Sequence, residues 1–120
     1  MLIDSNIIIA FAKDNSFDEF SSKFDREFFA SKITELEVLG YHALSNKDKL
    51  ELERIFSIIS LIDIDNTVIA EAIRLRQKKN MSVGDVIIAA TALTNDLPLV
   101  TANTADFKWI KNLELINPLS

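Results

Sequence analysis

Residues 84–107 constrain the fold of this 120-residue chain more than any other stretch. The stretch opens with Asp85, which is followed directly by an apolar run at residues 86–90. Asn95 and Asp96 are typical turn residues, and the short apolar segment 97–100 after them is typical of a strand. The pattern predicts a helix, a turn and a buried strand, in this order.

Polar side chains come directly after this predicted strand, in a loop that contains Thr101, Asn103, Thr104 and Asp106. Together with Asp85, they place acids at the rims of otherwise apolar elements. Isolated acids in such positions indicate a shared site rather than solvent-facing surface. We therefore predict that carboxylates from other parts of the chain lie close to Asp85.

The first residues of the chain repeat this arrangement of an apolar segment and an acid. Residues 1–3 are apolar and end at Asp4, Ser5 and Asn6 are good helix N-caps, and residues 7–12 are again apolar. The pattern predicts a buried strand, a tight turn and a helix. Ligands of open α/β sheets lie beyond the carboxyl ends of the strands, where Asp4 falls. The residues alone leave open whether Asp4 belongs to such a site or only caps the helix.

Glu37 is the next acid near a predicted junction, between a strand at residues 28–33 and a helix that begins at Thr34. The spacing from Thr34 to Glu37 is that of a capping box, in which each side chain binds a backbone amide at the helix start. Ser82 and Asp85 have the same spacing and allow the same interpretation. The alternative places Glu37 in a functional site, because its position after a strand matches that of Asp4.

Phe17, Phe20 and Phe24 are spaced as one face of a helix. Ordinary core packing is one interpretation of this phenylalanine face. The other is that part of it is exposed and receives a helix of a partner protein.

The densest basic cluster of the chain ends a predicted helix whose apolar residues recur over residues 68–75. Its members are Arg74, Arg76, Lys78 and Lys79. Basic residues at a helix C-terminus complement the helix dipole, and this explanation is strongest for Lys78 and Lys79. Arg74 and Arg76 are the best candidates for contacting phosphates.

The predicted elements alternate along the chain as β-α-α-β-α-β-α-α-β-β, with a closing strand at residues 113–116. Apolar strands that alternate with helices predict an α/β fold of three layers, α/β/α, in which helices cover both faces of a central, mainly parallel sheet. At this length we expect a single domain, residues 1–120.

Parallel strands would bring Asp4, Glu37, Asp85 and residues 101–106 to one edge of the sheet. Carboxylates gathered there repel one another unless a cation lies between them. Oxygen ligands, in a chain with no cysteine and a single histidine, select a hard cation such as Mg²⁺ or Mn²⁺. Such an ion activates water and polarises a phosphoryl oxygen, so phosphodiester hydrolysis is the expected reaction.

Composition argues against several other classes of protein. The net charge of −5 argues against broad binding of nucleic acid through a basic surface, though not against an enzyme whose acids hold a metal. No apolar run reaches the ~20 residues that cross a membrane, and no signal peptide is visible. The absence of cysteine excludes disulfides, and we expect a cytoplasmic protein.

Segments spread over nearly the whole chain resemble PIN-domain proteins, and specifically the VapC-type ribonuclease toxins of toxin–antitoxin pairs. The matching segments are residues 2–9, 33–40, 84–92, 99–107 and 113–118. The resemblance implies a PIN-like fold and a metal-dependent endoribonuclease, the toxin of a type II toxin–antitoxin system. It also implies a structured RNA substrate such as transfer RNA, a homodimer, and an antitoxin that lies across the phenylalanine-bearing helices and blocks the acidic site.

The resemblance also assigns roles to individual residues. Asp4, Glu37 and Asp85 match the three acids that hold Mg²⁺ or Mn²⁺, and Glu35 is a rival at a poorer spacing. Asn103 stands where many PIN nucleases carry an aspartate, so it supplies an amide oxygen while Asp106 contributes charge, and occupancy by a second metal stays open. The remaining implied roles are hydroxyl support of the metal ligands by Ser5 and Thr101, and RNA contacts by Arg74 and Arg76.

Three alternatives compete with a nuclease at this stage. One is a catalytically silent PIN-like module that only binds a partner protein, which Asn103 favours. Another is a signalling receiver domain, but that class needs adjacent acids after the first strand, where this chain has Ser5 and Asn6. The third is a plain α/β domain whose acids are all helix caps. We assign no catalytic role to His42, and we expect Trp109 to pack near the last strand.

Overall fold

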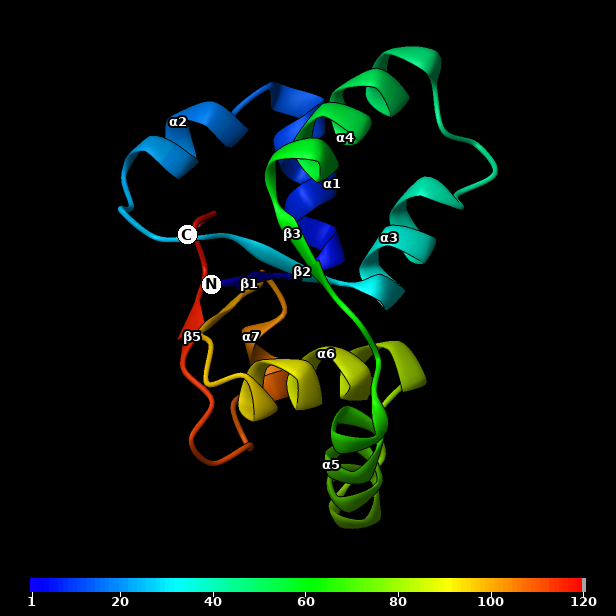
Figure 1. Ribbon diagram of the computed structural model, residues 1–120, viewed down its shortest axis with the longest axis vertical. Coiled ribbons are helices and arrows are strands. Elements are labelled where there is room, and N and C mark those ends of the chain that lie inside the picture. The colour runs from blue at the N-terminus through cyan, green and yellow to red at the C-terminus, as the bar shows by residue number, and fades with distance from the viewer. Residues whose placement is uncertain (120) are drawn as a thin grey trace.

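A five-stranded sheet organises the computed structural model, which describes residues 1–119 (Figure 1). The strands lie in the order β3-β2-β1-β4-β5, and every neighbouring pair is parallel. The strands are β1 (Leu2–Ile3), β2 (Phe29–Ser31), β3 (Ser60–Ile62), β4 (Leu99–Val100) and β5 (Leu115–Ile116). This parallel sheet confirms the α/β fold that the sequence predicts.

Helices cover both faces of the sheet and complete the three predicted layers (Figure 1). One layer contains α1 (Ser5–Asp14), α2 (Phe17–Ser22), α3 (Lys32–Leu39) and α4 (Asn46–Ile58). The other contains α5 (Asn66–Lys78), α6 (Val83–Thr94) and α7 (Thr104–Phe107). The short helix α7 occupies part of the segment that the sequence predicts as a polar loop.

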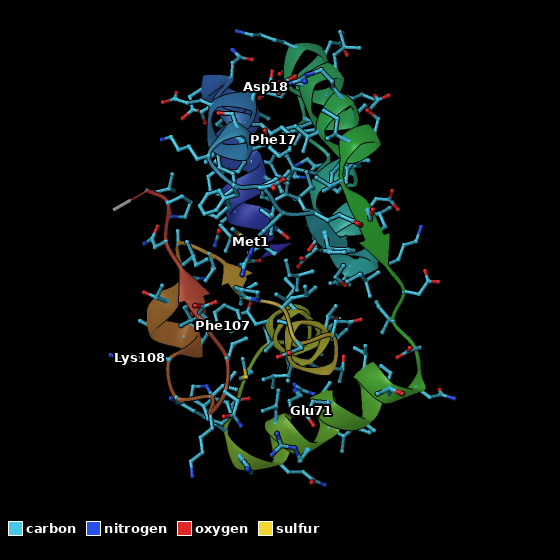
Figure 2. The ribbon with its side chains drawn as sticks, turned by 60° about the vertical axis from the view of Figure 1, so that its left-hand side comes forward. Met1, Phe17, Asp18, Glu71, Phe107 and Lys108 are labelled. Atoms are coloured by element: carbon cyan, nitrogen blue, oxygen red, sulfur yellow. The ribbon has the colours of Figure 1, made fainter. Side chains whose placement is uncertain are left out.

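Each helical layer buries its own apolar cluster against the sheet. Ile3 and Phe17 belong to the cluster beneath α1 to α4, whereas Leu2 and Phe107 belong to the cluster beneath α5 to α7. Figure 2 shows Phe17 and Phe107 on opposite sides of Met1. Successive strand residues therefore face opposite clusters, which is why these strands are apolar throughout rather than alternating with polar residues.

The phenylalanine face packs inside the chain. Phe17 and Phe20 are buried, and Phe24 is half-buried against the same cluster. The rings of Phe11 and Phe20 lie 4.9 Å apart and those of Phe20 and Phe24 lie 5.0 Å apart, between centroids. Core packing is therefore the correct interpretation, and the expected exposed phenylalanine surface for a partner is wrong for Phe17 and Phe20.

The helix starts match the sequence expectation at α6 but not at α3. Ser82 caps α6, and its hydroxyl accepts a hydrogen bond from the Asp85 amide at 3.1 Å. The cap of α3 is Ser31, whose hydroxyl accepts from the amide of Ile33. The predicted start at Thr34 and its capping box are wrong, because the strand β2 ends at Ser31 and a serine already stands there.

The helix α5 has both buried and exposed apolar side chains. In α5, Val68, Ala72 and Leu75 face the core, while Ile69 and Ile73 are exposed.

No helix among residues 1–119 is both long and apolar enough to cross a membrane.

The strands β1 and β4 form the point at which the chain changes faces of the sheet. They are direct neighbours, with Leu2 opposite Leu99 and Ile3 opposite Val100. After β1 the chain enters α1 in one layer, and after β4 it enters α7 in the other (Figure 1). In open α/β sheets, such a switch leaves a crevice beyond the carboxyl ends of the two strands, where ligands bind. Asp4 and Thr101 are the first residues beyond those ends.

Candidate active site

Asp4 is a buried carboxylate just beyond the carboxyl end of β1, where such a crevice is expected. Only 4% of the residue is exposed, and its backbone amide donates to the Val100 carbonyl at 2.9 Å. Its Oδ1 accepts from the amide of Ser5 at 2.7 Å, and its Oδ2 accepts from the hydroxyl of Thr101 at 2.8 Å. Asp4 thus caps α1 and also lies at the strand end, so the two interpretations of the sequence are compatible.

The electrostatic environment of Asp4 disfavours its charge. Burial raises the pKa of the Asp4 carboxyl above its ordinary value, and the charges of Asp85 and Glu37 raise this pKa further. The hydrogen bonds from Thr101 and from the Ser5 amide act in the opposite direction. Asp85 and Glu37 are therefore close enough for their charges to act on Asp4, as expected of acids that share a site.

Glu37 reaches the site from α3. Its side chain is exposed, and its Oε1 accepts a hydrogen bond from the Ser5 hydroxyl at 3.0 Å. Its Oε2 approaches α6 so closely that a Cβ atom added to Gly84 would lie 2.7 Å from it. Gly84 therefore provides the space that lets the Glu37 carboxylate lie against the first turn of α6.

Asp85 and Asp106 come from different helices and line a common hollow. Asp85 is the third residue of α6 and is half-buried, while Asp106 belongs to α7 and is exposed. The hollow has a volume of about 210 Å³, and its lining includes both acids together with Lys79, Ser82 and Trp109. We call it the α6–α7 hollow.

The loop after β4 is tied to Asp4 by two side chains. The Thr101 hydroxyl donates a hydrogen bond to Asp4 and also accepts one from the backbone amide of Asn103 at 3.0 Å. The Asn6 amide group donates to Asp4 Oδ2 at 3.4 Å, and its Oδ1 accepts from the Ala102 amide at 3.3 Å. The sequence prediction missed this bridging role of Asn6, although a side chain amide two residues after a strand-end acid was a usable signal.

Asn103 and the two arginines have less direct links to the acids. The side chain of Asn103 is exposed at the start of α7 and makes no capping hydrogen bond there. Arg74 forms an ion pair with Glu71, and Arg76 donates to the Met81 carbonyl at 3.1 Å. Both arginines therefore have partners within the chain, and Lys79, rather than either arginine, lines the hollow beside Asp85.

The donor chemistry of the site fits a hard divalent cation. The charges of Glu37 and Asp85 act on Asp4, and the groups that donate hydrogen bonds to Asp4 and Glu37 are hydroxyls and amides. Oxygen donors of this kind suit Mg²⁺ or Mn²⁺. Among residues 1–119, however, no three acidic, histidine or cysteine side chains lie close enough to hold an ion as they stand. Of these three acids, Glu37 is the one whose side chain is exposed.

Comparisons with known proteins agree with this architecture. Residues 1–112 match the PIN domain family. The ribonuclease VapC of Rickettsia bellii is 27% identical, and the match covers 97% of this chain and 94% of the relative. A toxin–antitoxin complex from Klebsiella pneumoniae superposes with a TM-score of 0.79 at 26% identity, covering 99% of this chain and 98% of that one. VapBC2 from Rickettsia felis, solved with a promoter DNA fragment, gives 0.81 at 23% identity, covering 97% and 96%.

Proposed function

The chain belongs to the PIN domain family, and we propose that it is a metal-dependent endoribonuclease, the toxin of a type II toxin–antitoxin system. The observation that carries this proposal is the buried Asp4, hydrogen-bonded at the crevice between β1 and β4 with the charges of Glu37 and Asp85 acting on it. The similarity to a ribonuclease over 97% of the chain supports the same reaction class.

The residues around Asp4 have separate roles in the proposed site. Thr101 and the Ser5 amide fix the two oxygens of Asp4, so that this carboxylate has a single orientation. Ser5 also holds Glu37 through its hydroxyl. Asp85 stands at the start of α6, where the helix dipole stabilises its negative charge. Carboxylates oriented in this way would hold an ion in a fixed position, and a fixed ion would keep a substrate phosphate near its reactive geometry.

Asp4, Glu37 and Asp85 would hold the ion, with the Asn103 amide oxygen and Asp106 as the outer polar groups. A bound Mg²⁺ or Mn²⁺ supplies a water of lowered pKa and neutralises charge on the phosphoryl oxygens. Its positive charge would also offset the charges of Asp85 and Glu37, which add to the larger effect of burial in raising the pKa of Asp4.

The proposed substrate is structured RNA such as transfer RNA. The net charge of −5 leaves the chain without a broadly basic surface, so sequence-independent attraction to long nucleic acid is weak. Recognition of a particular RNA shape at the crevice is the better fit to such a chain.

The proposed partner is a cognate antitoxin protein, and the proposed assembly of the toxin itself is a homodimer. A neighbouring structure, from Klebsiella pneumoniae, is a toxin–antitoxin complex. Since Phe17 and Phe20 are buried, we place the antitoxin on a hollow of about 420 Å³ lined by residues of α1, α3 and α4, among them Ile9, Val38 and Leu52. Tyr41 lines this hollow and is 55% exposed. The variant Tyr41→Glu should escape neutralisation by the antitoxin, and light scattering should give the mass of two chains.

Incubation of purified protein with total RNA tests the proposed reaction. Native protein with Mn²⁺ should cleave RNA, and the same protein in EDTA should not. The variant Asp4→Asn, purified identically, is the control for contaminating nucleases. Equal cleavage by native protein and Asp4→Asn would contradict the proposal. Sequencing of the cleaved ends shows whether transfer RNA is the target.

A catalytically silent binding module is the second candidate. It is favoured by the asparagine at position 103 and by the spacing of the acids, since no three of the described ligand side chains lie close enough together to hold an ion as they stand. Such a module would bind the antitoxin and leave RNA intact in Mn²⁺. A calorimetric titration with Mn²⁺ separates the two candidates. The nuclease should bind Mn²⁺, and Asp85→Asn should weaken that binding severely.

A further inference from the structure

The α6–α7 hollow combines groups that a carboxylate site for a metal does not need. Beside Asp85 and Asp106 it contains the ammonium of Lys79 and the indole of Trp109. The Lys79 Nζ lies 5.7 Å from the centroid of the Trp109 ring, which is a cation–π contact. Lys79 forms no ion pair with any of the described residues, despite the acidic neighbours.

Trp109 carries an unused hydrogen-bond donor. Its Nε1 is buried and has no acceptor within residues 1–119. Buried indole N–H groups usually have a hydrogen-bond partner, so the N–H of Trp109 is a donor that no group of the described chain uses. This observation is independent of the charges that surround the hollow.

We propose that the α6–α7 hollow is a subsite for one nucleotide of an RNA strand, next to the phosphate that the carboxylates act on. In this subsite Lys79 binds a phosphate and the Trp109 ring stacks on the unpaired base. This subsite rests on the ribonuclease function proposed above. The hollow suits a single nucleotide rather than a longer segment, because its volume of about 210 Å³ lies below the ~300–1,000 Å³ of sites that enclose larger ligands.

Lys79 has a contact to make both without RNA and with RNA in the hollow. Without RNA its ammonium covers the indole ring, and a lysine side chain is long and flexible enough to leave the ring for a phosphate. Movement of Lys79 uncovers the aromatic face at the same time as it places a positive charge near the strand. Aromatic stacking with a nearby cation is the usual way in which proteins bind single-stranded nucleic acid.

The hollow also explains how an acidic chain can hold a polyanion at its site. Asp85 and Asp106 alone would repel a phosphate, and Arg74 and Arg76 already have partners inside the chain. Lys79 is the cation that lines the hollow together with these two acids. Its positive charge is therefore close enough to offset their repulsion of a phosphate in the hollow.

Tryptophan fluorescence provides a direct measurement, since Trp109 is the single tryptophan of the chain. The binding experiment uses the variant Asp4→Asn in Mg²⁺, so that a single-stranded RNA octamer stays intact during titration. We expect the octamer to quench the fluorescence of Trp109. Anisotropy of a labelled octamer measures the same affinity without relying on the indole.

Substitutions in this background identify the groups that bind. Lys79→Gln and Trp109→Leu should each weaken octamer binding about ten-fold or more, and Trp109→Phe, which retains an aromatic ring, should weaken it less. Lys78→Gln is the matched control, because it removes the same charge from the adjacent position and should change the affinity less than about two-fold. Thermal unfolding of each variant verifies that it folds. In the native background, Lys79→Gln should raise KM and leave kcat nearly unchanged.

The possible results separate this subsite from the nuclease function. If native protein cleaves RNA but Lys79→Gln and Trp109→Leu bind and cleave as their parents do, the subsite is wrong and the function stands. If no RNA is cleaved, but the octamer quenches the fluorescence of Trp109 and Lys79→Gln weakens octamer binding, the subsite stands without the function. Equal quenching by adenosine monophosphate or inorganic phosphate, at the affinity of the octamer, would overturn an RNA subsite in favour of a small-anion site.

Discussion

The two halves of the candidate site differ in how firmly their groups are held. One half, which we call the buried half after its central Asp4, consists of Asp4, Thr101, Asn6, Ser5 and the exposed Glu37. These residues are joined by hydrogen bonds of 2.7 to 3.4 Å. The open half is the α6–α7 hollow, where Lys79 and Trp109 contact each other and no described side chain bonds to the carboxylates of Asp85 and Asp106. The first half is built between adjacent strands, and the second lies between two helices.

This difference suggests that the halves do different work. Groups that must act on a bond need fixed positions, and strand ends packed on both faces supply them. Groups that must accept varied nucleotides benefit from mobility, which a lysine and an open hollow supply. Substitutions in the buried half should therefore change the chemical step or the stability, and substitutions in the open half should change the affinity for RNA.

The largest effect should come from Asp4→Asn. Loss of even an outer supporting residue costs a metal site about 10–100-fold, so loss of the central carboxylate should lower RNA cleavage more than about 100-fold. Gel assays with a labelled RNA measure this rate, and circular dichroism verifies the fold. Cleavage within ten-fold of native would place the chemistry outside the buried half.

Gly84→Ala should separate activity from stability. The added Cβ would lie 2.7 Å from Glu37 Oε2 and must displace that carboxylate, which should slow cleavage about 10–100-fold. The free energy of unfolding should hardly fall, because the displaced atom ends a flexible, exposed side chain and alanine favours helices over glycine by about 1 kcal/mol. Urea unfolding and initial rates measure the two quantities. A protein destabilised in proportion to its lost activity would show that Gly84 serves packing instead.

Two threonines offer a matched comparison of stability. Thr101 and Thr34 are both fully buried, but Thr101 bonds Asp4 and the Asn103 amide, whereas Thr34 Oγ1 has no partner within residues 1–119. Thr101→Val should lower the free energy of unfolding by about 1–3 kcal/mol, because it leaves buried polar groups unpaired. Thr34→Val should leave stability unchanged or raise it. Equal losses in the two variants would mean that the Asp4 network contributes nothing specific.

The smallest effect is a pH dependence of stability in metal-free buffer. Burial raises the pKa of Asp4 in the folded protein above the ordinary value of 3.8 for this carboxyl. Below that value the carboxyl is protonated in both states, and as pH rises through the raised pKa the folded state loses stability relative to the unfolded one. The difference in unfolding free energy between native protein and Asp4→Asn, measured from about pH 3 to about pH 7, should shift against the native protein. An opposite slope would mean that hydrogen bonds to Asp4 outweigh its burial.

The sequence predicts the parts of the fold that depend on local signals. Asp85 follows a serine cap, precedes an uninterrupted apolar run and belongs to a helix that ends at a turn, so α6 and β4 are recognisable from neighbouring residues. Asp4 at the end of β1 is recognisable for the same reason. The start of α3 is not, because Ser31 and Thr34 are both good caps and only the end of the sheet decides between them.

Contacts between distant segments lie beyond what spacing can predict. Lys79 and Trp109 meet although they lie 30 positions apart in the sequence, because the loop before α6 and the segment after α7 approach the same hollow. Arg76 looks like a surface cation, yet it bonds the Met81 carbonyl, and that partner depends on how the chain turns after α5. The acids at residues 4, 37 and 85 can be chosen from the sequence with the help of the family resemblance, and a parallel sheet predicts that they share one edge. Which strands are neighbours at that edge comes from the strand order.

The bond between Thr101 and Asp4 joins residues 97 positions apart. During synthesis residue 4 leaves the ribosome long before residue 101, so the cradle of Asp4 cannot form on a nascent chain until β4 has emerged. If the chain is the ribonuclease proposed above, its nascent form lacks the bond that orients Asp4 and should not cleave RNA until β4 pairs with β1.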